Sequence, residues 1–307
     1  EGLAKDPNGM DNPYGVPNYL AYPSTQWVDE LFLSTTSQKH NVSVVGSSEN
    51  TNYLLSFGYL DNPGTLKNTG LKNYSGRINI ETQITKFLKV GTQTYATFQT
   101  REPGNTSFTY MYQNTPAVTP YHDGKYGVSV DGASTSNLLA DVMSRGGSYD
   151  DTRLNTTWYA KVNILDGLTA EARFNYQTLF NETATYSRKV DKQNFRTGEI
   201  IPGVSSSTAT TSRATTRYQN HTNTATINYA KTFGKHDISI LLGTEQYYWN
   251  VKGFSATRTG LLDLDLPDFT AALDLLDPTL GGTAEQDYGV ISYFGRLNYA
   301  YKNRYLL

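Results

Sequence analysis

The chain has 307 residues, a formal net charge of −2 and no cysteine. A near-neutral chain offers no basic field for nucleic acid, and a chain without cysteine has no disulfides, thiol nucleophiles or cysteine-bound zinc. The mean hydropathy of −0.51 and the shortness of every apolar run exclude a transmembrane helix, which needs about 20 apolar residues.

The first 38 residues show no clear period and are predicted to form an irregular lead-in segment, 1–38, before a strand-rich segment, 39–307. The chain opens at Glu1 without the features of a signal peptide. It stops at Leu307 within a predicted strand. We therefore expect it to be a piece of a longer protein.

From residue 39 onward, apolar and polar residues alternate with a period of two, which is typical of strands with two different faces. Many of these strands are longer than the usual 5–6 residues. Their length suits tilted strands that cross a bilayer, which need about 9–11 residues in the hydrocarbon. The predicted strands are 39–46, 52–60, 73–83, 88–100, 152–164, 168–180, 214–230, 236–250, 287–301 and 304 onward.

The connections between these strands alternate between short and long. The short ones are 46–51, 84–87, 165–167, 231–235 and 302–303. The long, polar ones are 61–72, 101–151, 181–213 and 251–286. Short turns at one end and long loops at the other indicate an outer-membrane β-barrel, with the turns in the periplasm and the loops outside. The predicted fold is all-β: a section of about ten antiparallel strands from a large transmembrane barrel.

A repeated pattern assigns the two faces of the predicted wall. The run Tyr74–Asn79 is echoed by Tyr293–Asn298, and each copy directly precedes a short turn. Alternation places one set of residues toward lipid: Ile78, Ile80, Val162, Ile227, Leu297 and Tyr299. It places the other set toward a polar lumen: Arg77, Asn79, Glu81, Lys161, Asn163, Glu171, Arg173, Asn228, Arg296 and Asn298.

Two features of the same pattern leave room for other interpretations. The aromatic run Tyr247–Trp249 fits an interfacial girdle, but also cross-strand pairs in a soluble sheet. A soluble all-β binding module or adhesin gives the same alternation when one face is wet. The strand lengths and the asymmetry of the loops favour the membrane barrel.

Several stretches resemble the SusC/RagA family, the TonB-linked outer-membrane transporters of glycan and peptide uptake systems. Trp27–Phe32 is similar to the family's W-x-D-E-x-F entry, and Gln38–Gly46 to its Q-x-H-N-L-S-V-S-G strand. Further similar stretches are Asn52–Asp61, Tyr74–Asn79, Leu88–Gly91 and Tyr293–Leu307. Ser47 and Asn73 depart from the family pattern without disturbing the alternation. The resemblance is strong over 26–99 and 285–307, and absent in the long loops.

The resemblance implies a barrel of about 22 strands with a plugged lumen, in the outer membrane of a Gram-negative bacterium and surrounded by its lipid. It implies active import of a bulky nutrient, an oligosaccharide ahead of a peptide, with a peptide importer as an alternative, beneath a SusD-like surface lipoprotein that acts as a lid. TonB would act through a plug that lies outside this chain, together with the remaining strands. No enzymatic activity and no cofactor are implied.

An alternative from another class is a small outer-membrane barrel hydrolase of the omptin kind. Such an enzyme needs paired aspartates and an Asp–His pair that converge at the loop end of the barrel. The four histidines, His40, His122, His221 and His236, are far apart in the sequence and give this alternative little support. No nucleophile elbow, P-loop or zinc-protease motif is present, so no catalytic residue is predicted.

The long loops supply the remaining candidates. Asp263, Asp265 and Asp268 are weak calcium candidates, since carboxylates are calcium ligands but EF-hand spacing is missing. A short helix capped by Asp268 is the alternative. Because aromatic rings stack on sugars and loops carry binding residues, the tyrosines of the longest loop are candidate substrate contacts: Tyr110, Tyr112, Tyr121, Tyr126 and Tyr149.

Overall fold

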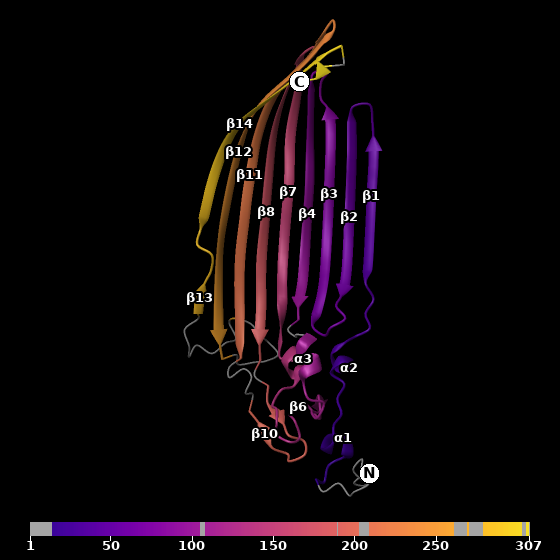
Figure 1. The fold of residues 1–307 in the computed structure, drawn as a ribbon, viewed down its shortest axis with the longest axis vertical. Helices are drawn as coiled ribbons and strands as arrows, with labels where there is room; N and C mark the ends of the chain where they lie inside the picture. The colour runs from indigo at the N-terminus through magenta and orange to yellow at the C-terminus, as the bar shows by residue number, and fades with distance from the viewer. Residues whose placement is uncertain are drawn as a thin grey trace.

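The computed structural model describes residues 14–104, 108–188, 190–202, 209–260, 269, 279–302 and 305–306. They form a tall curved sheet, with a small group of helices and short strands beyond one end (Figure 1). Among the described helices, none has the length and apolar character needed to cross a membrane.

The sheet, which we call the wall, is an antiparallel meander in which each long strand pairs with the long strands before and after it in the sequence. It runs in the order β1-β2-β3-β4-β7-β8-β11-β12-β14-β15, with β13 paired to β12. Its first strands are β1 (Gln38–Ser47), β2 (Thr51–Pro63), β3 (Thr69–Gln83) and β4 (Leu88–Pro103). Then follow β7 (Arg145–Leu165), β8 (Leu168–Ser187), β11 (Thr210–Phe233), β12 (His236–Thr259), β13 (Thr279–Gly281), β14 (Gln286–Tyr301) and β15 (Tyr305–Leu306).

Every long strand of the wall lies where the alternation predicts it, and most extend further toward the long loops. β11 and β12 each contain 24 residues: at the long-loop end β12 continues past the predicted limit of 250 to Thr259, and β11 begins at Thr210, before the predicted 214. The added stretches are rich in Thr, Ser and Arg and lack an apolar face. Val251 on one face and Thr211 and Ala256 on the other are buried, so neither face of these stretches is uniformly wet or uniformly apolar. Pairing therefore continues there without the alternation that reveals a strand in the sequence.

Three of the short turns at the opposite end, at the top of Figure 1, contain a residue with positive φ, namely Gly167, Gly234 or Lys302. Gly167 has φ +80° and Gly234 has φ +64°, backbone conformations that favour glycine. A tight turn fixes the register of the two strands that it joins. The fixed register then carries through the wall from one strand pair to the next.

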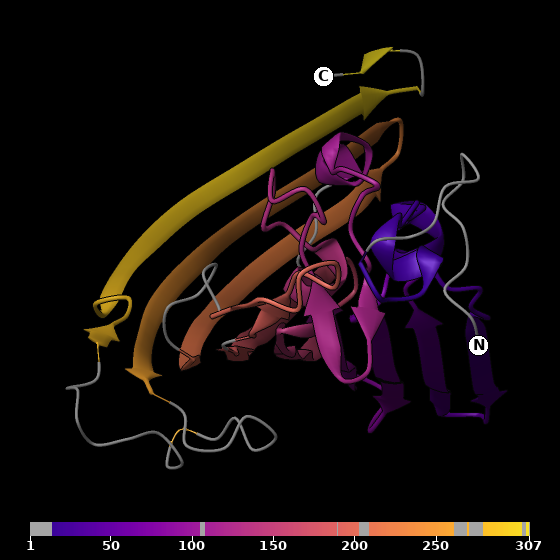
Figure 2. The same ribbon diagram turned by 90° about the horizontal axis from the view of Figure 1, so that it is seen from below.

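The other end carries a compact group of elements that we call the lobe. Its helices are α1 (Asn18–Ala21), α2 (Trp27–Leu31), α3 (Phe108–Gln113) and α4 (Leu138–Met143). Its short strands β5 (Tyr121–His122), β6 (Lys125–Gly127), β9 (Lys192–Gln193) and β10 (Ile200–Ile201) form a second sheet in the order β10-β9-β6-β5. Seen from below, the wall is an open arc, and the lobe projects over its inner side (Figure 2).

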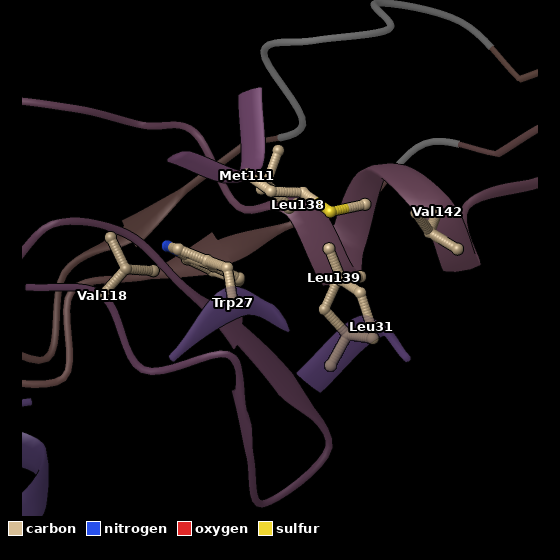
Figure 3. Close-up of a cluster of buried hydrophobic side chains, with 7 residues drawn as sticks. All are labelled: Trp27, Leu31, Met111, Val118, Leu138, Leu139 and Val142. Atoms are coloured by element: carbon tan, nitrogen blue, oxygen red, sulfur yellow. The ribbon is translucent and has the colours of Figure 1, made fainter. Parts of the chain in front are cut away.

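The lobe has a closed hydrophobic core, unlike the wall. Trp27 and Leu31 of α2 pack with Met111, Val118, Leu138, Leu139 and Val142, all less than a tenth exposed (Figure 3). The Trp27 indole donates a hydrogen bond to the Thr115 carbonyl oxygen at 3.0 Å. The stretch similar to the W-x-D-E-x-F motif therefore supplies the main apolar contacts between the lead-in and the longest loop.

Buried polar groups hold the loops of the lobe together. The Asn137 side-chain amide donates to the carbonyl oxygens of Thr119, Pro120 and Gly127, while its oxygen caps α4 by accepting from the Ala140 amide. The Lys192 ammonium is buried and donates to the Thr135 carbonyl oxygen at 2.9 Å. Burial lowers the pKa of Lys192, partly offset by Asp141.

Candidate functional site

The register of the wall separates its side chains into two faces. We call the polar face the one that carries Arg77 on β3 and Arg173 on β8, and the apolar face the one that carries Ile78 and Phe174. All of the residues predicted to face the lumen lie on the polar face: Arg77, Asn79, Glu81, Lys161, Asn163, Glu171, Arg173, Asn228, Arg296 and Asn298. Those predicted to face lipid lie on the apolar face: Ile78, Ile80, Val162, Ile227, Leu297 and Tyr299.

Large apolar side chains are exposed on the apolar face. Phe57, Leu242 and Leu297 are each more than half exposed, and Ile291 is 60% exposed. Exposed apolar surface of this extent needs a cover, and a lipid-facing band provides one in outer-membrane barrels. An aromatic row runs across four strands of this face, with ring centroids 5.7 Å apart for Trp158–Phe174, 6.2 Å for Phe174–His221 and 5.1 Å for His221–Tyr248.

Several charges of the polar face are paired, within a strand or across strands. Glu81 accepts from the Lys89 ammonium at 2.8 Å and from the Tyr159 hydroxyl at 2.8 Å. Arg173 pairs with Glu171 and lies 5.0 Å above the Tyr159 ring. This network joins β3, β4, β7 and β8 near the short turns. It stabilises the wall, whereas Arg77, Lys161 and Arg296 of the same face form no ion pair among the described residues.

Nearer the lobe, the polar face has a depression of about 320 Å³ with a different chemistry. Its polar-face lining is Arg153, Asn155, Gln177, Leu179, Tyr218, Asn220 and Trp249. The next strand extends the aromatic surface, because the Tyr288 ring lies 5.5 Å from that of Trp249 and 5.8 Å from that of Tyr247. Aromatic rings, amides and a guanidinium group thus meet on one patch of four strands and their neighbour β14.

The sequence alone did not identify this patch. The sequence predicts the run Tyr247–Trp249 either as one girdle or as cross-strand pairs. The register divides it between two faces: Tyr248 joins the aromatic row of the apolar face, while Tyr247 and Trp249 lie on the polar face. The alternation in the same strand could have indicated this division. Ile238, Ile240 and Leu242 have even numbers, which places the even-numbered Tyr248 on their apolar face and the odd-numbered Tyr247 and Trp249 on the other. The pairing of Trp249 with Asn220 and Tyr288 needed the register.

The predicted substrate-contact tyrosines lie in three separate places. Tyr110 and Tyr112 are exposed on α3, 62% and 81% respectively. Tyr121 and Tyr126 are paired in the small sheet, with ring centroids 5.0 Å apart. Tyr126 packs against the lobe core, and its burial raises its pKa. These four do not form a single binding surface with the fifth.

The fifth, Tyr149, was placed in the longest loop, but it lies in β7, which begins at Arg145. There the Arg101 guanidinium lies 5.6 Å from its ring centroid. The calcium candidates Asp263, Asp265 and Asp268 lie outside the described residues. Within the part of the chain that the structure describes, no group of three acidic or histidine side chains is placed to hold a metal ion.

The four histidines also lie apart, each against an aromatic ring. His40 stacks on Tyr59 at 6.3 Å, and His122 contacts Phe195 in the lobe at 5.6 Å. His221 belongs to the aromatic row, and the His236 ring lies 5.9 Å from Tyr299 near the short turns. They are distributed from the lobe to the opposite end of the wall, so they do not converge on one site.

The long tilted strands, the two-faced wall and the short and long connections define a section of a large outer-membrane β-barrel. Comparison with known proteins agrees. The chain is 24% identical to the TonB-dependent receptor P3 of Formosa agariphila, over 94% of the chain and 29% of that protein. It is 22% identical to the TonB-dependent receptor SusC of Bacteroides thetaiotaomicron, over 95% of the chain and 30% of that protein.

A solved structure shares the same fold. The RagAB peptide transporter superimposes with a TM-score of 0.70 at 20% identity, covering 91% of this chain and 32% of that one. No family model matches the chain. The relatives confirm the resemblance to the SusC/RagA family of TonB-linked transporters, and they are receptors and transporters rather than enzymes. The chain spans less than a third of the length of the relatives that it matches.

Proposed function

We propose that the protein containing this chain imports a bulky oligosaccharide across the outer membrane of a Gram-negative bacterium, with energy from TonB. The observation that carries the proposal is the two-faced wall. An apolar face clad in lipid and a polar face with paired charges are what the wall of a water-filled import channel needs. The names of the relatives, TonB-dependent receptors, support the source of energy.

In this proposal, residues 1–38 lead into the barrel and residues 39–307 form part of its wall. The polar face lines the lumen, including the ten residues named above from Arg77 to Asn298. The plug, the TonB-binding segment and the remaining strands belong to the rest of the protein. The lobe stands at the extracellular mouth, where a SusD-like lipoprotein closes the lumen.

The exposed side of the lobe is the part best placed to meet that lid. Tyr110 and Tyr112 project from α3, whose neighbours belong to the lobe core. Exposed tyrosines are common at protein interfaces because they bury apolar area and keep a polar tip. Substrate contact by these tyrosines, and calcium binding by Asp263, Asp265 and Asp268, stay predictions.

A peptide is the second candidate substrate, favoured by the similarity to the RagAB peptide transporter. Uptake by whole cells separates the two. Cells with and without the gene are given fluorescently labelled oligosaccharides or labelled oligopeptides, each also in a strain that lacks TonB. We expect gene- and TonB-dependent uptake of an oligosaccharide. Uptake of peptides alone would replace the substrate, and uptake that is independent of TonB would overturn the transport mechanism.

A further inference from the structure

We propose that the depression on the polar face between β7 and β12, extended by the rings of β14, is a carbohydrate-binding subsite on the wall of the barrel. This inference rests on the proposed import function and specifies where a sugar binds. The subsite consists of Tyr218, Trp249, Tyr247 and Tyr288 as an aromatic platform, with Arg153, Asn155, Gln177 and Asn220 as its polar border.

Two rings of the platform are exposed on the polar face. Tyr288 is 52% exposed and Tyr218 is 39% exposed, and they lie among polar residues rather than in a lipid-covered band. Exposed aromatic area in water is costly unless a ligand covers it. Lipid cannot provide that cover, because the register places these rings on the face opposite Tyr248 and His221.

The arrangement of the rings suits a sugar. The Trp249 and Tyr288 rings are 5.5 Å apart and tilted by 42°, so they form a shallow trough rather than a closed stack. The hexose ring has an apolar C–H face that packs on aromatic surfaces and a rim of hydroxyl groups that form hydrogen bonds. An aromatic floor with hydrogen-bonding groups at its edge is complementary to both.

The polar border supplies both hydrogen-bond donors and hydrogen-bond acceptors, and the hydroxyl groups of a sugar need both. Asn155 is held in place, because its oxygen accepts from the Asn175 amide at 2.8 Å. The Asn220 amide lies 3.4 Å from the Tyr247 hydroxyl, which links the border to the platform. Among the described residues Arg153 is exposed and forms no ion pair, whereas Arg101, Arg173 and Lys89 are each paired with a carboxylate.

The position along the strand also suits an entering nutrient. Trp249 lies 13 residues after His236, the first residue of β12. At about 3.3 Å per residue, that is roughly 40 Å along the strand. An apolar band about 25 Å tall at a tilt of about 40° uses less strand than this. The subsite therefore lies in the half of the wall nearest the lobe, on the side from which the nutrient comes.

The test uses the intact transporter, purified in detergent with any lipoprotein that accompanies it. Binding is measured on an array of neutral and acidic oligosaccharides and on an oligopeptide library. Four forms are compared: the natural protein, Trp249→Ala with Tyr288→Ala, Trp249→Phe, and Tyr248→Ala. Tyr248→Ala is the matched control, since Tyr248 is adjacent in the sequence but lies on the apolar face.

We expect the natural protein to bind at least one oligosaccharide class and the double variant to bind it at least tenfold more weakly. Trp249→Phe retains an aromatic floor and should keep most of the affinity, and Tyr248→Ala should keep all of it. Resistance to heat and protease shows that each variant is folded. If the double variant is misfolded, Tyr288→Ala alone takes its place, with the same tenfold criterion.

Each other outcome contradicts part of the argument. Oligosaccharide binding that the double variant leaves unchanged overturns the subsite and leaves the import function standing. Equal loss in Tyr248→Ala shows a general structural effect, and also overturns the subsite. Binding of peptides alone overturns the carbohydrate assignment, and binding of neither class overturns both the subsite and the proposed function.

Discussion

The apolar residues of the wall and those of the lobe are shielded from water in different ways. In the wall, Val44, Phe57 and Leu242 are more than half exposed within the protein. In the lobe, Leu31 and Val118 are fully buried by other residues of the chain. The wall satisfies its backbone polar groups by strand pairing and leaves its apolar face to lipid. In the proposed function the lobe stands outside the bilayer in water, so it must build a core of its own.

The difference predicts where substitutions do most damage. A cavity matters in the lobe, because packed neighbours surround each core residue. A charge matters on the apolar face of the wall, because lipid cannot solvate it. The following changes, in the intact receptor, test this contrast from the largest expected effect to the smallest.

Trp27→Ala should weaken the lobe by about 3–5 kcal/mol, the usual cost of removing a buried large aromatic side chain. It also leaves the Thr115 carbonyl oxygen without its donor. Hydrogen exchange of the α4 amides measures the free energy of local opening. The wall strands should keep their protection, and Tyr112→Ala, at an 81% exposed position, should change little. Equal loss of protection in the wall would mean that the two regions unfold as one.

Ile78→Lys should lower the stability of the wall in lipid vesicles by about 2–4 kcal/mol, the cost of a lysine near the middle of the bilayer. Asn79→Lys, one residue further on, places the same charge on the polar face and should have little effect. The measured quantity is the denaturant concentration at which half of each variant has unfolded, with protease resistance as the readout of folding. Similar losses in both variants would contradict the assignment of the two faces.

Asn137→Ala should cost the lobe about 1–3 kcal/mol, because the carbonyl oxygens of Pro120 and Gly127 lose this donor and α4 loses its cap, while the Thr119 oxygen keeps the Gly127 amide as a donor. Asn137→Asp keeps the capping oxygen but not the amide donors. It therefore separates the two contributions. Limited proteolysis of the 119–137 region reports the effect. A lobe that is unchanged by both substitutions would show that the buried amide is not essential to it.

Lys231→Ala should change stability by less than about 1 kcal/mol. The Lys231 ammonium lies 3.3 Å from an Asp166 carboxylate oxygen at the short turns, but the Asp166 side chain is 91% exposed. Water screens such pairs almost completely. The same denaturation experiment measures the change in stability caused by Lys231→Ala. A larger loss would mean that the short turns depend on charge pairing as well as on strand register.

The sequence predicted the wall well because one physical rule acts on every strand. A strand between lipid and a polar interior must alternate, so Ile78 and Asn79 reveal their faces without any knowledge of their neighbours. The prediction became too short where that rule stops. From Thr210 to Arg213, for example, β11 continues with no alternation to mark it.

The lobe could not be predicted from the sequence, because no single local rule acts on its segments. Its core combines Trp27, Met111 and Leu138 from three separate segments. Each helix there has only four to six residues, too few for a helical period to be visible. Tyr149 shows the same limit, since a residue assigned to a loop lies in a strand whose start carries no apolar signal.

By itself the sequence determined the fold class, the positions of the long strands and the face of each strand residue, because these depend on local alternation and on the solvent at each face. Tertiary structure alone decided which residues meet across strands and loops. The rings of Trp249 and Tyr288 lie on strands separated by a long loop, and only the register brings them together with Asn220. Contacts between distant segments depend on how the whole wall pairs, and no local pattern contains that information.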